Sequence, residues 1–386
     1  MFLRFPIIMR CLVILLVVDA LAITITFFIP EHFFLKAYLS ERAEQSIQRF
    51  FKEESAVLPD ELLGWKTKPN INKDYWKIAS DGSRDSGQTE WEKTEVSKRV
   101  LFLGNSLING GEGVTNRETI SASLEEIAKK SNQPIATKNF ATMAYGLDQS
   151  VLQYREQLHS TQAQWIVVGL NEDVNSALTN QFLPFRIPDE DSLPFLKPQF
   201  YFANAKYDLA ENPANISRLK TVLQDSNQAK NLLQSISEQD AYYSRFKSFS
   251  HFNWMPLSRG ISTLARKTET LKSYFFEQEK NYVLAQSILN HMNDLAQERN
   301  AKVIFVYLPS KQGYARSGVW NYLPDYYAQR LAWLQNSGVT ILDGREMLKK
   351  SNGSIEPSDL YIEDALHFTA EANKKFAEIL WMTIKQ

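Results

Sequence analysis

The chain has 386 residues, and its 43 basic and 44 acidic side chains leave a formal net charge of -1. Such an even balance gives no global field that would attract nucleic acid or anionic lipid, so we expect no polyanionic partner. Hydrophobic residues make up 44% of the chain and no fixed-period repeat interrupts it, which excludes a disordered or fibrous protein.

An apolar segment near the N-terminus predicts a membrane anchor. Residues 11–29 form an apolar run, and residues 7–9 can extend it to the thickness of a bilayer core. Arg4 and Arg10 precede the run and Glu31 follows it, which favours a cytoplasmic N-terminus at residues 1–6. The sequence therefore predicts a single-pass membrane protein anchored at residues 7–29, with the rest of the chain exported to the periplasmic or extracellular side.

A cleaved signal peptide is the alternative interpretation of this segment. Residues 11–18 form a short apolar core, and Ala20-Leu21-Ala22 resembles a small-residue cleavage site. Hydrophobicity that continues through Phe28 favours a retained anchor instead. The only cysteine, Cys11, lies inside the segment, so no intramolecular disulfide can form and cysteine usage leaves the compartment open.

Residues 30–98 are polar and charged, and we interpret them as a stalk and lead-in segment that precedes the main domain at residues 99–386. Within that domain, short apolar runs alternate with segments of helical periodicity, which predicts a parallel sheet with helices on both sides. The expected fold is α/β, a flavodoxin-like three-layer α/β/α sandwich with a five-stranded parallel sheet. The five predicted strands are residues 99–103, 135–140, 165–170, 302–308 and 339–342.

The alternation lapses between about residues 180 and 282. This stretch is first rich in proline and aromatic residues and then becomes polar with helical character. We expect a largely helical insertion at the carboxyl edge of the sheet, where the loops of an active site gather.

Two positions carry residues suited to nucleophilic catalysis. Ser106 follows the first predicted strand, where the ligand site of an open parallel sheet lies. Asp364 precedes His367 by one helical turn, and a serine nucleophile needs a histidine base that a carboxylate orients. Each pattern alone also fits an ordinary turn or helix cap. Together, in this order, they favour a catalytic triad.

Four short blocks carry a resemblance to a known family. They are Gly104-Asn105-Ser106, the stretch NFATMAYGLDQ at residues 139–149, Gly169-Leu170-Asn171, and Asp364-Ala365-Leu366-His367-Phe368-Thr369. In this order, on these elements, they resemble the blocks of SGNH (GDSL-like) hydrolases over residues 99–386, apart from the insertion. Residues 63–65, 113–115 and 172–175 are similar to those of cell-envelope members with an N-terminal anchor.

The resemblance implies the role of each site residue. Ser106 would attack an ester carbonyl, and His367, oriented by Asp364, would act first as base and then as acid. The oxyanion hole would combine the backbone N–H of Ser106 with the side-chain amide of Asn171. It would also include a backbone N–H from the second block, supplied by Ala144 or Gly146.

The sequence departs from the family pattern at three places. Asn105 stands where the family usually has Asp, and Ala144 aligns with the usual glycine, with Gly146 nearby. Glu172 follows Asn171 where Asp is common, and Asn175 offers a competing amide. The interpretation of Asn171 as an Asx-type turn residue also stays open.

The function expected from these residues is that of a serine esterase acting through an acyl-serine intermediate on an acylated cell-envelope glycan or lipid. An O-acyltransferase that acetylates an envelope polysaccharide would use the same triad. A non-catalytic binding or assembly protein with this fold is the alternative of another class. We expect no cofactor and no metal, because no histidine pair has metal-ligand spacing and no P-loop is present. Protein partners stay unassigned.

Overall fold

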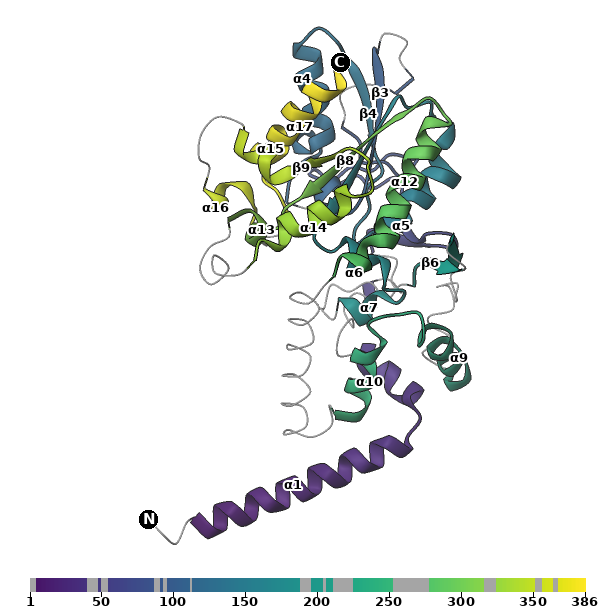
Figure 1. The fold of residues 1–386 in the computed structure, drawn as a ribbon, viewed down its shortest axis with the longest axis vertical. Helices are drawn as coiled ribbons and strands as arrows, with labels where there is room; N and C mark the ends of the chain where they lie inside the picture. The colour runs from purple at the N-terminus through teal and green to yellow at the C-terminus, as the bar shows by residue number, and fades with distance from the viewer. Residues whose placement is uncertain are drawn as a thin grey trace. The chain divides into compact units, whose positions relative to one another are not determined.

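Figure 1 shows the fold of the chain in a computed structural model. The residues it describes form thirteen segments of the chain. They are 5–39, 48–49, 55–86, 91–92, 96–111, 113–187, 196–203, 206–210, 225–252, 278–315, 324–350, 356–363 and 367–386.

A five-stranded parallel sheet forms the centre of the α/β unit, as the sequence predicted. Its strands lie in the order β4-β3-β5-β8-β9, and each pairs in parallel with its neighbours. The inner strands are buried along most of their length because both faces of the sheet are covered. The strands are β3 (Lys98–Leu103), β4 (Ile135–Asn139), β5 (Trp165–Asn171), β8 (Lys302–Leu308) and β9 (Ile341–Asp343).

Helices cover both faces of this sheet, which completes the predicted three-layer sandwich (Figure 1). One group, drawn to the left of the strands, comprises α4 (Ile120–Lys130), α15 (Gly344–Lys350) and α17 (Ala370–Ile384), and α17 packs against both of the others. The other group comprises α5 (Leu147–Gln153), α12 (Val283–Gln297) and α14 (Tyr326–Gln335), and α12 contacts both of its companions.

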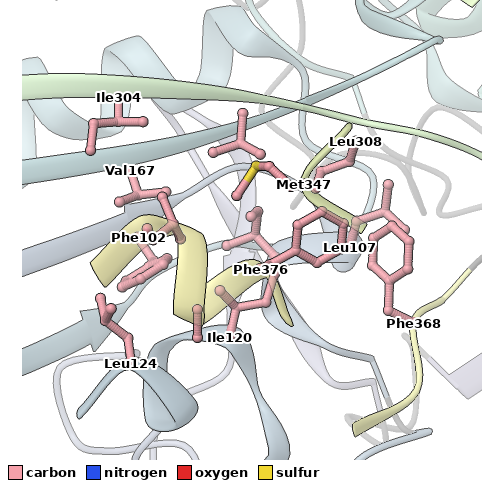
Figure 2. Close-up of a cluster of buried hydrophobic side chains, with 14 of the residues drawn as sticks. Phe102, Leu107, Ile120, Leu124, Val167, Ile304, Leu308, Met347, Phe368 and Phe376 are labelled. Atoms are coloured by element: carbon pink, nitrogen blue, oxygen red, sulfur yellow. The ribbon is translucent and has the colours of Figure 1, made fainter. Parts of the chain in front are cut away.

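The apolar faces of α4 and α17 meet the sheet in one hydrophobic cluster (Figure 2). Leu124 of α4 and Phe376 of α17 are fully buried there, together with Phe102 and Val167 from neighbouring strands. Complete burial of an aliphatic or aromatic side chain contributes roughly 1.5–3 kcal/mol. This cluster fixes the last helix against the first strand, and therefore brings the two ends of the α/β domain together.

Residues 55–86 belong to the same compact unit as the sheet. They begin with an antiparallel hairpin, β1 (Val57–Asp60) and β2 (Gly64–Thr67), in which Trp65 is fully buried. Further on, the backbone N–H of Arg84 donates to the carbonyl of Asn139 at the end of β4 (2.8 Å). This part of the lead-in segment is therefore folded onto the carboxyl end of the sheet.

A second compact unit takes residues 1–54, 179–197 and 212–277. Its described helices include α7 (Leu183–Arg186), α9 (Ser226–Ile236) and α10 (Tyr243–Phe252), which share an apolar core with Tyr38. Buried Asp240 accepts hydrogen bonds from the backbone N–H groups of Gln181 and Phe182 (2.8 and 2.7 Å). Within the described residues, the predicted insertion contributes these helices to the second unit, whereas its antiparallel hairpin, β6 (Gln199–Ala203) and β7 (Lys206–Ala210), belongs to the unit of the sheet.

The predicted membrane anchor forms a single helix, α1 (Phe5–Phe28). Within it, Met9–Phe28 has a mean hydropathy of 2.7, and only 11% of its most apolar window is buried. It is the one helix of the described chain that is long and apolar enough to cross a membrane. By length and composition alone, a signal sequence near the N-terminus would have the same properties.

Candidate active site

The strand order places the candidate site at the carboxyl ends of β3 and β5. The chain runs from β3 to β4 on one side and then returns to β5 on the other, so its winding direction reverses between these two strands. In open α/β sheets a crevice forms at such a switch point, and ligands bind there. Ser106 follows β3 and Asn171 ends β5.

Ser106 is the first residue of a one-turn helix, α3 (Ser106–Asn109), and it is partly exposed. The side chain of Asn105 caps this turn by accepting a hydrogen bond from the N–H of Leu107 (3.0 Å). Asn and Asp are almost equally good N-caps. The departure from the family pattern at this position therefore preserves the local structure that presents the serine.

Two glycines allow the turn to sit close to the sheet. Gly104 has a φ of 133°, and a Cβ there would lie 3.0 Å from the carbonyl oxygen of Gly169. At Gly169 a Cβ would lie 2.2 Å from Cγ1 of Ile108, a fully buried residue of the same turn as Ser106. Any side chain at either glycine would push the nucleophile turn away from β5.

Buried asparagines tie the nucleophile turn to the second block. Asn109 Nδ2 donates to the carbonyl of Ala141 (2.7 Å), and Asn139 Nδ2 donates to the carbonyl of Ile108 (2.9 Å). Asn139 Oδ1 in turn accepts from the N–H of Ala141 (3.1 Å). The loop that carries the second-block backbone is therefore held in a fixed position relative to Ser106.

The two second-block candidates for the oxyanion hole differ in their local geometry. The N–H of Gly146 donates to Oε1 of Gln149 (3.0 Å), as part of the start of α5. Ala144 precedes that turn with a φ of 60°, in the left-handed region that favours glycine. Ala144 thus adopts a backbone conformation that favours glycine, whereas the N–H of Gly146 already has a partner, and the donor role of either residue stays a prediction.

We expect Ala144→Gly to stabilise the protein by about 0.5–1 kcal/mol, because left-handed backbone costs a side-chain-bearing residue roughly 1–2 kcal/mol and glycine adds some unfolded-state entropy. The free energy of unfolding in urea measures the change. Ala332→Gly is the matched control, because Ala332 lies exposed within helix α14 and glycine there should destabilise by about 1 kcal/mol. Equal destabilisation by both changes would contradict the left-handed assignment.

The lead-in hairpin buttresses the second-block loop. Trp65 Nε1 donates to the carbonyl of Met143 (2.8 Å), and the Tyr145 hydroxyl donates to the carbonyl of Trp65. Gln149 Nε2 also reaches the carbonyl of Leu63 (2.7 Å). The Leu63-Gly64-Trp65 stretch noted in the sequence therefore supports the backbone on both sides of Ala144.

Asn171 lies at the end of β5, paired in register with Leu308 and partly exposed. The next residue, Glu172, turns to β8, where its Oε1 accepts from both the N–H and the hydroxyl of Ser310 (2.8 Å each). Burial raises the pKa of the Glu172 carboxyl, and the hydrogen bonds from Ser310 oppose the rise. Glu172 thus binds the loop after β8. Asn171, the last residue of β5, is therefore the residue of this pair whose side-chain amide lies at the carboxyl end of the strand.

The structure places His367 against the loop that follows Ser106. A Cβ on Gly111 would lie 3.3 Å from both Cδ2 and Nε2 of the imidazole. The His367 carbonyl accepts from the N–H of Ile362 (3.0 Å), and Thr369 caps α17 through Ala372 N (3.3 Å). Hydrogen bonds therefore fix the backbone at His367 and just after it, next to the loop that follows Ser106.

One core anchors both candidate catalytic residues. Leu107 and Phe368, which immediately follow Ser106 and His367, are buried in the same hydrophobic cluster (Figure 2). The backbone next to the candidate serine and the backbone next to the candidate histidine are therefore anchored in one packed core.

Asp364 lies outside the described residues, so its role stays a prediction from sequence, as do the catalytic roles of the other site residues. The residue that sequence reasoning missed is Arg84, which is buried and donates hydrogen bonds to the carbonyls of Asn109, Gly111 and Val114. Its only sequence signal was an Asp-Gly-Ser-Arg turn. Among the described residues, no group of three or more His, Cys, Asp or Glu side chains could hold a metal ion.

No family model matches the chain, and no curated protein matches its sequence. Solved structures similar to it include a lipolytic protein assigned to the G-D-S-L family from Desulfitobacterium hafniense (12% identity, TM-score 0.34, covering 74% of this chain and 99% of that chain). Others are the esterase EstA from Pseudoalteromonas (11%, 0.35, 75% and 97%) and Axe2, an acetylxylan esterase from Geobacillus stearothermophilus (10%, 0.38, 76% and 97%). This likeness is distant, so the function is argued below from the site itself.

Proposed function

We propose that this chain is a membrane-anchored serine acyl hydrolase that acts through an acyl-Ser106 intermediate. One observation carries the proposal. Ser106 follows the first sheet strand at its carboxyl end, and a Cβ on Gly111, in the loop that follows this serine, would lie 3.3 Å from the imidazole of His367, although the serine and the histidine are far apart in the sequence. A binding module has no physical need for that pair, whereas nucleophilic catalysis requires it.

The proposed mechanism assigns one step to each residue. His367 takes the hydroxyl proton of Ser106 as the serine oxygen attacks the ester carbonyl, and Asp364 holds the imidazole in the right tautomer. The N–H groups of Ser106 and Ala144 and the amide of Asn171 stabilise the oxyanion. His367 then protonates the leaving alcohol. Water, activated by the same imidazole, releases the acid.

The proposed location is the outer face of a membrane, with α1 retained as the anchor. The 24 residues of α1 span about 36 Å at 1.5 Å per residue, enough to cross a hydrocarbon core of about 30 Å. The Phe27 ring, at the end of α1, stacks on that of His251 in α10 at 4.2 Å. The high mean hydropathy of the segment, which continues through Phe28 beyond the Ala20-Leu21-Ala22 sequence, supports retention as an anchor.

The proposed substrate is an acylated glycan or lipid of the cell envelope, because an anchored, exported domain meets such molecules. Transfer to a sugar hydroxyl would share the same acyl-serine, and the difference lies in whether the pocket excludes water and positions the acceptor. Hydrolysis and transfer therefore differ only in whether water or a sugar hydroxyl attacks the acyl-Ser106 intermediate.

The test uses the full chain in detergent with p-nitrophenyl acetate as the acyl donor, alone and with an added xylo-oligosaccharide acceptor. We expect release of p-nitrophenol matched by free acetate in both conditions, measured by absorbance and by mass spectrometry of the sugar. Acetylated sugar in place of acetate would establish the transferase instead. The absence of p-nitrophenol release and of fluorophosphonate labelling would contradict both and favour a binding protein.

A further inference from the structure

Arg84 is a buried arginine, 3% exposed, whose guanidinium lies under the loop that follows Ser106. Its Nη1 donates to the carbonyls of Asn109 (2.7 Å) and Gly111 (2.8 Å), and its Nη2 donates to the carbonyl of Val114 (2.6 Å). Three backbone carbonyls of one short loop therefore converge on a single side chain.

The arginine itself is held from the other side. Its Nε donates to Oδ1 of Asn116 (3.1 Å), its Nη2 also donates to the carbonyl of Tyr75 (3.2 Å), and its backbone N–H donates to Asn139 (2.8 Å). Burial lowers the pKa of the guanidinium to about 10, so it is still charged at neutral pH. Carbonyl dipoles surround this charge, which is the arrangement a buried cation requires.

The loop whose carbonyls Arg84 binds also contacts the ring of His367. Gly111 has a φ of 57°, and a Cβ there would lie within 3.3 Å of the imidazole. We propose that Arg84 is a positioning residue: by binding the carbonyls of Asn109, Gly111 and Val114, it fixes Gly111, and Gly111 in turn sets the position of the His367 ring. This inference rests on the proposed serine hydrolase function.

The expected consequence is a loss of turnover without a loss of substrate binding. Displacing a catalytic group by about 1 Å can cost about 100-fold in rate, because the reacting atoms leave their attack geometry. Arg84 contributes no group to the site itself. Its removal should therefore lower kcat and leave KM for p-nitrophenyl acetate within about 3-fold, since an effect confined to the transition state leaves binding unchanged.

The experiment measures kcat and KM of the full-length protein carrying Arg84→Gln or Arg84→Lys. We expect kcat to fall about 30- to 100-fold in the glutamine variant, and less in the lysine variant, because an ammonium retains the charge but not the fork of donors. Arg345→Gln is the matched control. Arg345 is also buried, 9% exposed, but it bonds to Asp325 and the Gly313 carbonyl, and its loss should lower the melting temperature while leaving kcat unchanged.

A double-mutant cycle separates positioning from general destabilisation. In a His367→Ala background, Arg84→Gln should cause no further loss of residual activity, because the group it positions is gone. Equal losses in both backgrounds would overturn the proposal, as would an unchanged kcat in folded Arg84→Gln protein. If the glutamine variant does not fold, Gly111→Ala replaces it, since its Cβ would touch the imidazole directly and should likewise lower kcat only when His367 is present. An inactive wild-type protein would instead refute the proposed function, and this inference with it.

Discussion

Ser106→Ala is expected to lower kcat/KM for p-nitrophenyl acetate by about 10⁴-fold or more, because no other group can then form the acyl intermediate. The protein should stay folded. Asn105, not Ser106, caps the turn, and the buried side chains of Leu107 and Ile108 keep its position. Steady-state kinetics measure the loss, and a thermal melt confirms that the variant is folded.

Ser131→Ala is the matched control for this change. Ser131 lies exposed at the end of α4, where its hydroxyl only reaches the carbonyl of Ile127 (3.0 Å). Its loss should leave the rate unchanged. Esterase activity that persists in Ser106→Ala but not in heat-denatured protein would remove Ser106 from the mechanism and require another nucleophile.

His367→Ala should lower turnover nearly as far as Ser106→Ala does, since a serine hydroxyl without its base is a weak nucleophile. The two residues act as a unit, so the double variant should be no slower than either single one. Because the imidazole lies against Gly111, its removal leaves a space of its own shape, and added imidazole should restore part of the rate. Steady-state rates with and without imidazole measure this.

His159→Ala controls for the loss of a histidine, because His159 is exposed on a short 3-10 helix away from the sheet's carboxyl edge. Its rate should match that of the wild type. A His367→Ala protein with wild-type turnover would show that the base is another residue, even if Ser106 is the nucleophile.

The sheet and its helices were predictable because burial leaves a direct mark on the sequence. Strands covered on both faces appear as short apolar runs, and helices that pack on a sheet show apolar residues at helical spacing. All five predicted strands are present, with boundaries that move by at most a few residues, as at residues 339–342, where β9 is Ile341–Asp343.

The supporting parts of the site were not predictable, because they depend on contacts between distant backbone groups. Arg84 binds carbonyl oxygens, which every residue possesses, so its partners leave no sequence signal. Ala144 gives no hint of its left-handed backbone, which only the tertiary fold imposes. The candidate serine and histidine could be proposed from sequence because their chemistry is specific to the residue type, whereas positioning depends on geometry alone.

The central claim is that Ser106 is a nucleophile activated by His367, and labelling tests it most directly. Full-length protein is incubated with a fluorophosphonate and digested, and the modified residue is located by tandem mass spectrometry. The account predicts a single phosphonyl adduct on Ser106 that forms far more slowly in the His367→Ala variant. An adduct on a different serine, or equally fast labelling without the histidine, would contradict it.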